Sequence, residues 1–245
     1  MQDDGKTLRI DGEIASMVES TSRKPRKAAS QQLPSLENIV ETLRNRIVNQ
    51  ELPPGSKLRE SVLTEEFNVS RPRIREAFGV LEDRGLIQRI PNRGAVVTRL
   101  EADEIFALFE VREVMEALAV RLATERTDPA SWADLVERFD GPAESALQQG
   151  DLDFYIDCIN QFRERTTVAA GNAILTDQMA SFYDRTKVLI RRLVLVPGRA
   201  AQGLKQHQEI LKAMSDGDAE LAERLKRANI RSSRDSFAEY RKYLL

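Results

Sequence analysis

The feature that most constrains this chain is the run from Val69 to Phe78, which has the pattern of a helix start. Ser70 is placed to cap a helix, because a serine side chain accepts hydrogen bonds from the free backbone N–H groups of the first turn. Pro72 follows within that turn, where a missing N–H costs little. The apolar residues that follow recur at helical spacing and predict one buried face: Ile74, Ala77, Phe78 and Leu81.

Three arginines, Arg71, Arg73 and Arg75, lie off this apolar face and are predicted to point outward. Guanidinium groups clustered at a helix start suit phosphate oxygens and guanine edges. A solvated basic helix end would have the same composition, so the arginines alone leave both interpretations open. The residues on either side decide between them.

The residues before this run predict two more helices. Apolar residues at helical spacing mark both of them: Leu36, Ile39, Val40, Leu43 and Ile47 in the first, and Val62, Leu63 and Phe67 in the second. The first helix ends before the Pro/Gly-containing turn at 52–55, and a tight turn at 68–69 leads into Ser70. This succession has helix-turn-helix spacing.

The residues after the third helix predict a β-hairpin. Gly85 is placed to end the helix. Residues 86–90 and 95–98 are strand-like and rich in β-branched side chains, and the turn between them, 91–94, has a basic tip. Three helices and a basic-tipped hairpin make a winged helix-turn-helix, whose third helix enters the major groove while the hairpin contacts an adjacent groove or phosphates.

From Glu101 onward the sequence has no convincing strand pattern and repeats helical stripes of apolar residues, which predicts an all-α domain of about six helices. We therefore expect a mainly α fold, with an N-terminal winged helix-turn-helix (three helices plus a β-hairpin wing) joined to a C-terminal all-α helical bundle. The expected boundaries are a flexible polar tail at 1–34, a winged helix-turn-helix DNA-binding domain at 35–99, and an all-α domain at 100–245. No phosphate loop, dinucleotide fingerprint or nucleophile elbow is present in the sequence.

The charge distribution agrees with a DNA-binding N-terminal domain. The 245 residues suffice for two small domains, and the chain carries a net charge of −2. Residues 35–100 contain 11 Lys/Arg against nine Asp/Glu, whereas residues 101–245 contain 20 against 25. Because the basic excess of the first domain is small, tight DNA binding would need arginines gathered on one face and two copies of the domain.

The remaining composition excludes several classes. The single cysteine, Cys158, excludes an internal disulfide and a cysteine metal cluster. No apolar run reaches about 18 residues, so no membrane span is expected. Residues 1–34 lack the apolar core of a signal peptide, and we expect a cytoplasmic protein.

Several polar residues fall on the apolar stripes of the predicted helical domain. Arg112 and Glu116 are spaced to pair with one another, and Arg163, His207 and Asn229 each share a face with apolar neighbours. Buried polar groups need partners. They could form structural salt bridges and hydrogen bonds inside the bundle, or they could converge on a ligand cavity between helices.

Residues 36–98 resemble the DNA-binding domain of the GntR superfamily of bacterial transcription regulators. The matching segments are residues 52–58 (LPPGSKL), 70–78 (SRPRIREAF), 81–87 (LEDRGLI) and 93–97 (RGAVV). The resemblance implies operator contacts by Ser70, Arg71 and Arg75, with Arg73 close by. It also matches Asn92, Arg93 and Gly94 to the wing. Many members carry an arginine at the position of Ser61, and here Arg59 is expected to reach the same DNA backbone.

Residues 101–245 resemble the C-terminal helical effector domain (FCD type) of the FadR subfamily. The matching segments are residues 109–112 (FEVR) through Glu116, 169–172 (AAGN), 207–214 (HQEILKAM) and 217–222 (GDAELA). The resemblance implies that residues 100–245 form an effector-binding and dimerisation domain, and it favours an effector cavity over purely structural pairing. It also implies a homodimer that binds pseudo-palindromic double-stranded operator DNA and acts as a repressor.

Many relatives hold a metal in this cavity through an aspartate and three histidines. The corresponding positions here are Ile159, Arg163, His207 and Asn229, so three of the four ligands are absent. We therefore predict no metal and no cofactor. Arg163 places a fixed positive charge where relatives place a metal, which predicts a carboxylate or phosphate effector. The predicted cavity residues are Arg112, Glu116, Asn160, Arg163, His207 and Asn229.

Other interpretations remain open at this point. Arg163 could pair with Glu116 alone, leaving a cavity for a neutral ligand or none. The chain could be a structural DNA-binding protein without an effector, against which the polar residues facing the helical core argue weakly. A metal-dependent enzyme built on the helical domain is disfavoured by the lone histidine, the lone cysteine and the missing ligands, so no enzyme is expected.

Overall fold

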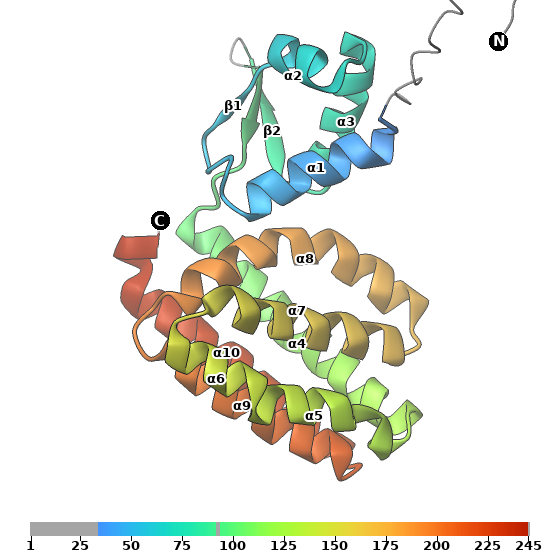
Figure 1. The fold of residues 1–245 in the computed structure, drawn as a ribbon, viewed down its shortest axis with the longest axis vertical. Coiled ribbons are helices and arrows are strands. Elements are labelled where there is room, and N and C mark those ends of the chain that lie inside the picture. Colours follow the sequence, from blue (N-terminus) through green and yellow to red (C-terminus); the bar gives the residue numbers. More distant parts are fainter. Residues whose placement is uncertain (1–33, 92–93, 245) are drawn as a thin grey trace, which may run out of the picture. The chain divides into compact units, whose positions relative to one another are not determined.

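The computed structural model describes residues 34–91 and 94–244 (Figure 1). The predicted tail therefore lies outside the described residues, apart from its last position. The N-terminal part contains α1 (Leu36–Val48), β1 (Lys57–Leu58), α2 (Glu60–Phe67), α3 (Arg71–Asp83), β2 (Ile87–Ile90) and β3 (Gly94–Val97). This is the predicted winged helix-turn-helix.

The sheet of this part has one strand that the sequence did not predict. Its strand order is β1-β3-β2, with antiparallel pairing throughout. β1 consists of two residues, and Lys57 pairs with Val96 while Leu58 pairs with Ala95. A two-residue strand is too short to display an alternating pattern, so only its pairing with β3 reveals it.

The start and end of α3 agree with the sequence, with one correction. Ser70 occupies the N-cap position with extended backbone, but its side chain makes no capping hydrogen bond. The prediction that its hydroxyl caps the helix is therefore wrong, and the hydroxyl stays free for another partner. Gly85 has φ +67° just after the helix, a left-handed conformation that favours glycine, which confirms it as the helix stop.

The apolar stripes of the three helices meet in one core with the sheet. Ile39, Leu43, Ile74 and Leu81 are fully buried in it, and Val97 adds the inner face of β3. Because this core fixes the apolar face of α3, the opposite face with its arginines must point to solvent.

The second part contains seven α-helices and one short 3-10 helix among the described residues, where about six helices were expected (Figure 1). They are α4 (Ala102–Arg126), η1 (Pro129–Trp132), α5 (Ala133–Asp140), α6 (Pro142–Gln149), α7 (Leu152–Ala169), α8 (Ala173–Val194), α9 (Arg199–Ser215) and α10 (Ala219–Leu244). α5 and α6 have eight residues each. None of the described helices is long and apolar enough to cross a membrane.

The long helices α4, α7, α9 and α10 build the region that matters for function. α4 packs against α10 and α7, and α10 also packs against α9. Their shared core includes Phe139, Phe162, Leu211 and Met214. The polar residues discussed next project from these helices into the interior of the bundle.

Candidate functional site

The outer face of α3 presents the predicted DNA contacts. Ser70, Arg71 and Arg75 are exposed, and Arg73 is half-buried. Arg71 and Arg75 are four residues apart and therefore lie on the same side of the helix. This arrangement follows from the burial of Ile74 and Ala77 on the opposite side.

Carboxylates hold two of these arginines. The Arg75 Nε lies 3.0 Å from both carboxylate oxygens of Glu60, at the start of α2, and this hydrogen bonding raises the pKa of Arg75. Arg73 pairs with Glu76 on its own helix at 2.9 Å. The ion pairs orient exposed guanidinium groups without removing them from solvent.

The other predicted DNA contacts are only partly described. Arg59 occupies the N-cap position of α2 and is exposed. Gly94 begins β3 with φ +80°, while Asn92 and Arg93 lie outside the described residues. Sequence reasoning missed Arg89 of β2, which donates a hydrogen bond to the Arg75 carbonyl oxygen and pairs with Glu82. Arg89 thereby ties the wing to α3.

A second site lies inside the helical domain. One cavity, with about 430 Å³ of space not filled by atoms and part of it open to solvent, is bounded by side chains from α4, α7, α8, α9 and α10. The four positions at which relatives carry metal ligands all line it: Ile159, Arg163, His207 and Asn229. Arg112 and Glu116 line it as well, so the predicted convergence of these residues is observed.

Asn160 was predicted to line this cavity, but it is not among the lining residues. It contributes instead to an outer groove between α7 and α8, together with Arg163 and Tyr183. The reason is helical geometry, because Ile159 points into the cavity and the next residue is turned by about 100° around the helix axis.

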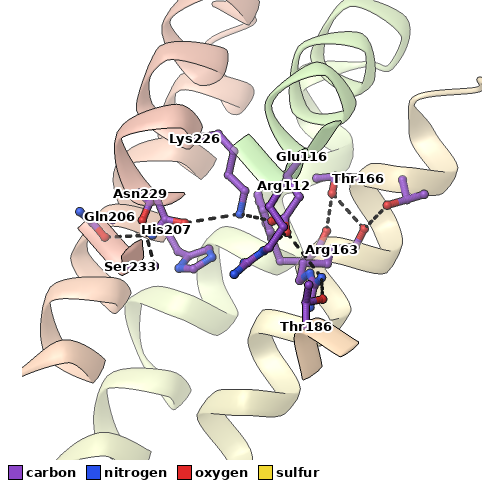
Figure 2. Close-up of polar contacts among 12 residues, drawn as sticks. Arg112, Glu116, Arg163, Thr166, Thr186, Gln206, His207, Lys226, Asn229 and Ser233 are labelled. Carbon is purple, nitrogen blue, oxygen red and sulfur yellow. Dashed lines mark hydrogen bonds and ion pairs between the residues drawn. The ribbon is translucent and has the colours of Figure 1, made fainter. Parts of the chain in front are cut away.

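Glu116 is the centre of a buried ion cluster (Figure 2). Its carboxylate accepts a hydrogen bond from Arg112 Nε at 2.9 Å, and Arg163 Nη2 lies 3.5 Å away. Lys226 Nζ lies 3.0 Å from the other oxygen, an ion pair without hydrogen-bond geometry. Burial alone would raise the pKa of Glu116, but these three cations together hold it well below its usual range, so Glu116 is ionised.

Sequence reasoning missed two cations of the cavity, Lys226 of α10 and Arg199 of α9. Both are buried, and desolvation lowers the pKa of each. Arg199 donates hydrogen bonds to Ser233 and Gln206 and has no carboxylate partner among the described residues. The signal for Lys226 was weak, because it directly follows Leu225 of the apolar stripe and resembles a solvated lysine.

His207 is held as a neutral ring. Its Nδ1 lies 2.8 Å from the Gly203 carbonyl oxygen, and it stacks on Phe139 while meeting Phe162 edge-on. Burial lowers its pKa to about 3, so it carries no charge near neutral pH. Since a carbonyl oxygen can only accept, Nδ1 carries the proton and Nε2 presents a lone pair.

The remaining contacts show that a metal does not fit. Asn229 donates to Gln206 at 2.9 Å and turns its amide oxygen toward Lys226. Arg163 donates to Thr186 at 2.7 Å and stacks on the Tyr183 ring. His207 therefore offers the single good nitrogen ligand, and the described residues contain no group of three His, Cys, Asp or Glu able to hold a metal ion. The prediction of a metal-free protein stays a prediction.

Comparisons with known proteins cover both parts of the chain. Residues 35–97 match the model of bacterial regulatory proteins of the gntR family, and residues 107–232 match the FCD domain. The HTH-type transcriptional repressor RspR of Escherichia coli K12 is 25% identical over 92% of this chain and 96% of its own length. The HTH-type transcriptional regulator YdhC of Bacillus subtilis is 28% identical over 74% of this chain and 80% of its own.

A solved structure shares the fold. Escherichia coli McbR/YncC superposes with a TM-score of 0.71 at 21% identity, covering 86% of this chain and 99% of that one. The winged helix with its exposed arginines and the helical domain with its charged cavity thus fall within the two matched families. This chain belongs to the GntR family of bacterial transcription regulators and carries an FCD effector domain.

Proposed function

We propose that this regulator is a homodimeric repressor whose binding to a pseudo-palindromic operator is modulated by a small anion in the cavity of the helical domain. The observation that carries the anion is the imbalance of charge in the cavity. Among the described lining residues, Glu116 is the one carboxylate, against four cationic side chains: Arg112, Arg163, Arg199 and Lys226. Buried cations need compensation, and a carboxylate or phosphate would supply it.

The DNA half of the proposal rests on α3. Arg71 and Arg75 share its exposed face, which suits phosphates or guanine edges, and Arg59 and the wing around Gly94 would contact the flanking backbone. Residues 35–99 would form the DNA-binding domain and residues 100–245 the effector-binding and dimerisation domain. RspR supports the assignment as a repressor, because that relative is named a repressor and its alignment with this chain covers nearly the whole length of both proteins.

The experiment is thermal denaturation of the full-length protein in a series of carboxylates and inorganic phosphate, with chloride as the reference. A ligand that binds the folded state raises the melting temperature with concentration. We expect such a rise for carboxylates, and we expect Arg163→Ala to reduce it. Arg121→Ala, on the exposed side of α4, is the control and should behave as the wild type. Equal melting temperatures in all anions would refute the proposal.

The cavity also separates this proposal from a structural DNA-binding protein. Such a protein would have no use for a cavity lined by four buried cations and one carboxylate, because a well-packed apolar interior would be at least as stable. An effector provides the reason to keep them. Its binding would shift the protein between two arrangements of different operator affinity.

A further inference from the structure

We propose that Asp184 of α8 is a latch that holds the winged helix in the orientation that binds a two-fold operator, and that the same turn of α8 connects this latch to the cavity. The inference rests on the proposed function for the part that the ligand plays, because it names how the cavity would control DNA binding. It follows from one helical turn that contacts both domains.

Ion pairs of Asp184 join the winged helix to the helical domain, within one compact unit. The carboxylate accepts a hydrogen bond from Arg44 Nε of α1 at 2.6 Å, and Arg84 Nη1, just after α3, lies 3.6 Å from its other oxygen. The Asp184 side chain is 4% exposed, whereas Glu41, the other acid paired with Arg44, is 54% exposed. Because a buried ion pair is lost when either partner is removed, Asp184 fixes α1 and the end of α3 against α8.

The next residue of α8 adds a second contact with the end of α3. Arg185 Nε donates a hydrogen bond to the Arg84 carbonyl oxygen at 3.4 Å. Its guanidinium group fills the space beside Gly85, where any side chain would overlap it. Residues 184 and 185 together therefore hold the end of the helix that carries the exposed arginines.

The rest of the junction is mostly apolar and incompletely filled. About 560 Å³ of space not filled by atoms, part of it open to solvent, lies between Leu86 and Val97 of the winged helix and Val188 and Phe237 of the helical domain. Apolar contact is non-directional and lets two surfaces slide, whereas a charged hydrogen bond has a fixed geometry. The orientation of the winged helix therefore depends on Asp184.

The same turn of α8 reaches the cavity through Tyr183 and Thr186. Arg163 donates a hydrogen bond to Thr186 at 2.7 Å (Figure 2), and it stacks on the Tyr183 ring at 3.9 Å from the centroid. Arg163 also lines the cavity, where its Nε has no partner among the described residues. Since residues 183–186 belong to one helical turn, a ligand that changes how Arg163 holds Thr186 also shifts Asp184.

The latch favours DNA binding and does not block it. Arg71 and Arg75 remain exposed on the outer face of α3 while Asp184 is paired. In a dimer, two winged helices held in a fixed orientation avoid the ordering that binding to two half-sites would otherwise cost. Release of Asp184 should therefore weaken binding to a two-fold site and leave binding to a single half-site unchanged.

The first test measures the latch itself by limited trypsin digestion of the full-length protein. Arg99 is exposed and lies in the segment between β3 and α4 that connects the two domains. We expect Asp184→Asn and Arg44→Gln to speed cleavage after Arg99 by about fivefold or more, because release of the winged helix opens this segment. Glu41→Gln, which removes the exposed partner of Arg44, is the matched control and should be cleaved like the wild type.

The second test measures DNA binding. It uses a two-fold duplex that the wild-type protein selects from a random-sequence library, and a duplex with one of its half-sites. Asp184→Asn should bind the two-fold duplex about fivefold or more weakly and the half-site duplex as the wild type does. A defect in the folding of the winged helix would weaken both. The Asp184→Asn/Arg44→Gln double variant should bind no more weakly than either single variant, since both changes remove one contact.

The connection with the cavity is tested in the same assay without any ligand. Arg163→Ala removes the hydrogen bond to Thr186 and should reproduce part of the loss on the two-fold duplex. Arg121→Ala, on the exposed side of α4, should bind like the wild type. If Arg163→Ala also binds like the wild type, the connection between the cavity and the latch is refuted.

The outcomes separate this inference from the proposed function. The latch is overturned if Asp184→Asn and Arg44→Gln leave either cleavage or two-fold binding unchanged, if they weaken binding to both duplexes, or if the wild type selects no two-fold duplex. Melting temperatures that rise with carboxylates would then still support the anion site. If the latch variants behave as expected but no anion raises the melting temperature, the latch stands and the anion site falls.

Discussion

At the scale of single residues, α4 carries two Arg-Glu pairs of the same spacing in opposite environments. Arg112 and Glu116 are buried, whereas Arg121 and Glu125 are both more than 40% exposed. The same sequence pattern therefore has two different roles. An exposed pair contributes little to stability, while loss of one member of a buried pair leaves an uncompensated charge.

This contrast predicts the effect of removing the central carboxylate. Glu116→Gln leaves Arg112, Arg163 and Lys226 without their shared partner and should reduce the free energy of unfolding by about 3–5 kcal/mol. Glu125→Gln, the matched control, should change it by less than about 1 kcal/mol. Chemical denaturation monitored by circular dichroism measures both. Similar losses for the two variants would show that the buried cluster is not special.

The single histidine makes the pH dependence of stability informative. In the unfolded chain the imidazole takes up a proton as pH falls below its ordinary pKa of 6.5. In the folded protein His207 stays neutral down to a pKa of about 3, so the unfolded state binds more protons between these two values. Stability should therefore fall as pH decreases below 6.5, by about 2 kcal/mol at pH 5.

Other groups act at lower pH. The pKa of Glu116 is depressed, so its contribution is present above the ordinary carboxyl range and is lost as pH falls through the folded value. Most of the loss between pH 7 and 5 is thus due to His207, and His207→Gln should remove that part. Denaturation at pH 7, 6 and 5 measures it, and an unchanged slope in the variant would contradict the assignment.

At the scale of helices and strands, α3 connects the fold with DNA recognition. Arg71→Ala should weaken operator binding by ~1–3 kcal/mol if the guanidinium makes a bidentate base contact. Glu60→Gln releases Arg75 from its ion pair and should change affinity less, because Arg75 itself remains. Mobility-shift titration at fixed salt compares them. If a folded Arg71→Ala/Arg75→Ala variant bound the operator as tightly as the wild type, these arginines of α3 would not be the operator contacts.

The same scale shows what the sequence could and could not predict. The position of α3 follows from Ile74, Phe78 and Gly85, because periodicity and a stop residue are local signals. β1, with two residues, is too short for such a pattern. Lys226 was missed because its burial depends on Glu116, a residue of another helix far away in the sequence. Long-range pairing leaves no local signal.

At the scale of the whole molecule, the exposed side of α4 supports a dimer. Val111, Val114 and Leu118 follow one another at helical spacing and are 45%, 54% and 37% exposed. Grouped apolar side chains on one face of a long helix are typical of a surface that a partner covers. A second copy of the chain is the partner that the proposed two-fold operator implies, since one winged helix with 11 basic and nine acidic residues offers few net contacts with phosphate.

Val114→Glu places a charge in the middle of this apolar row and should convert the dimer to a monomer. Because two winged helices bind a two-fold site together, the variant should also bind the operator much more weakly and protect one half-site at most. Val168→Glu, at an isolated exposed valine of α7, is the control and should leave both properties unchanged. Light scattering gives the mass and footprinting gives the protected length. A wild-type protein that is monomeric at micromolar concentration and covers one asymmetric site would refute the two-fold arrangement.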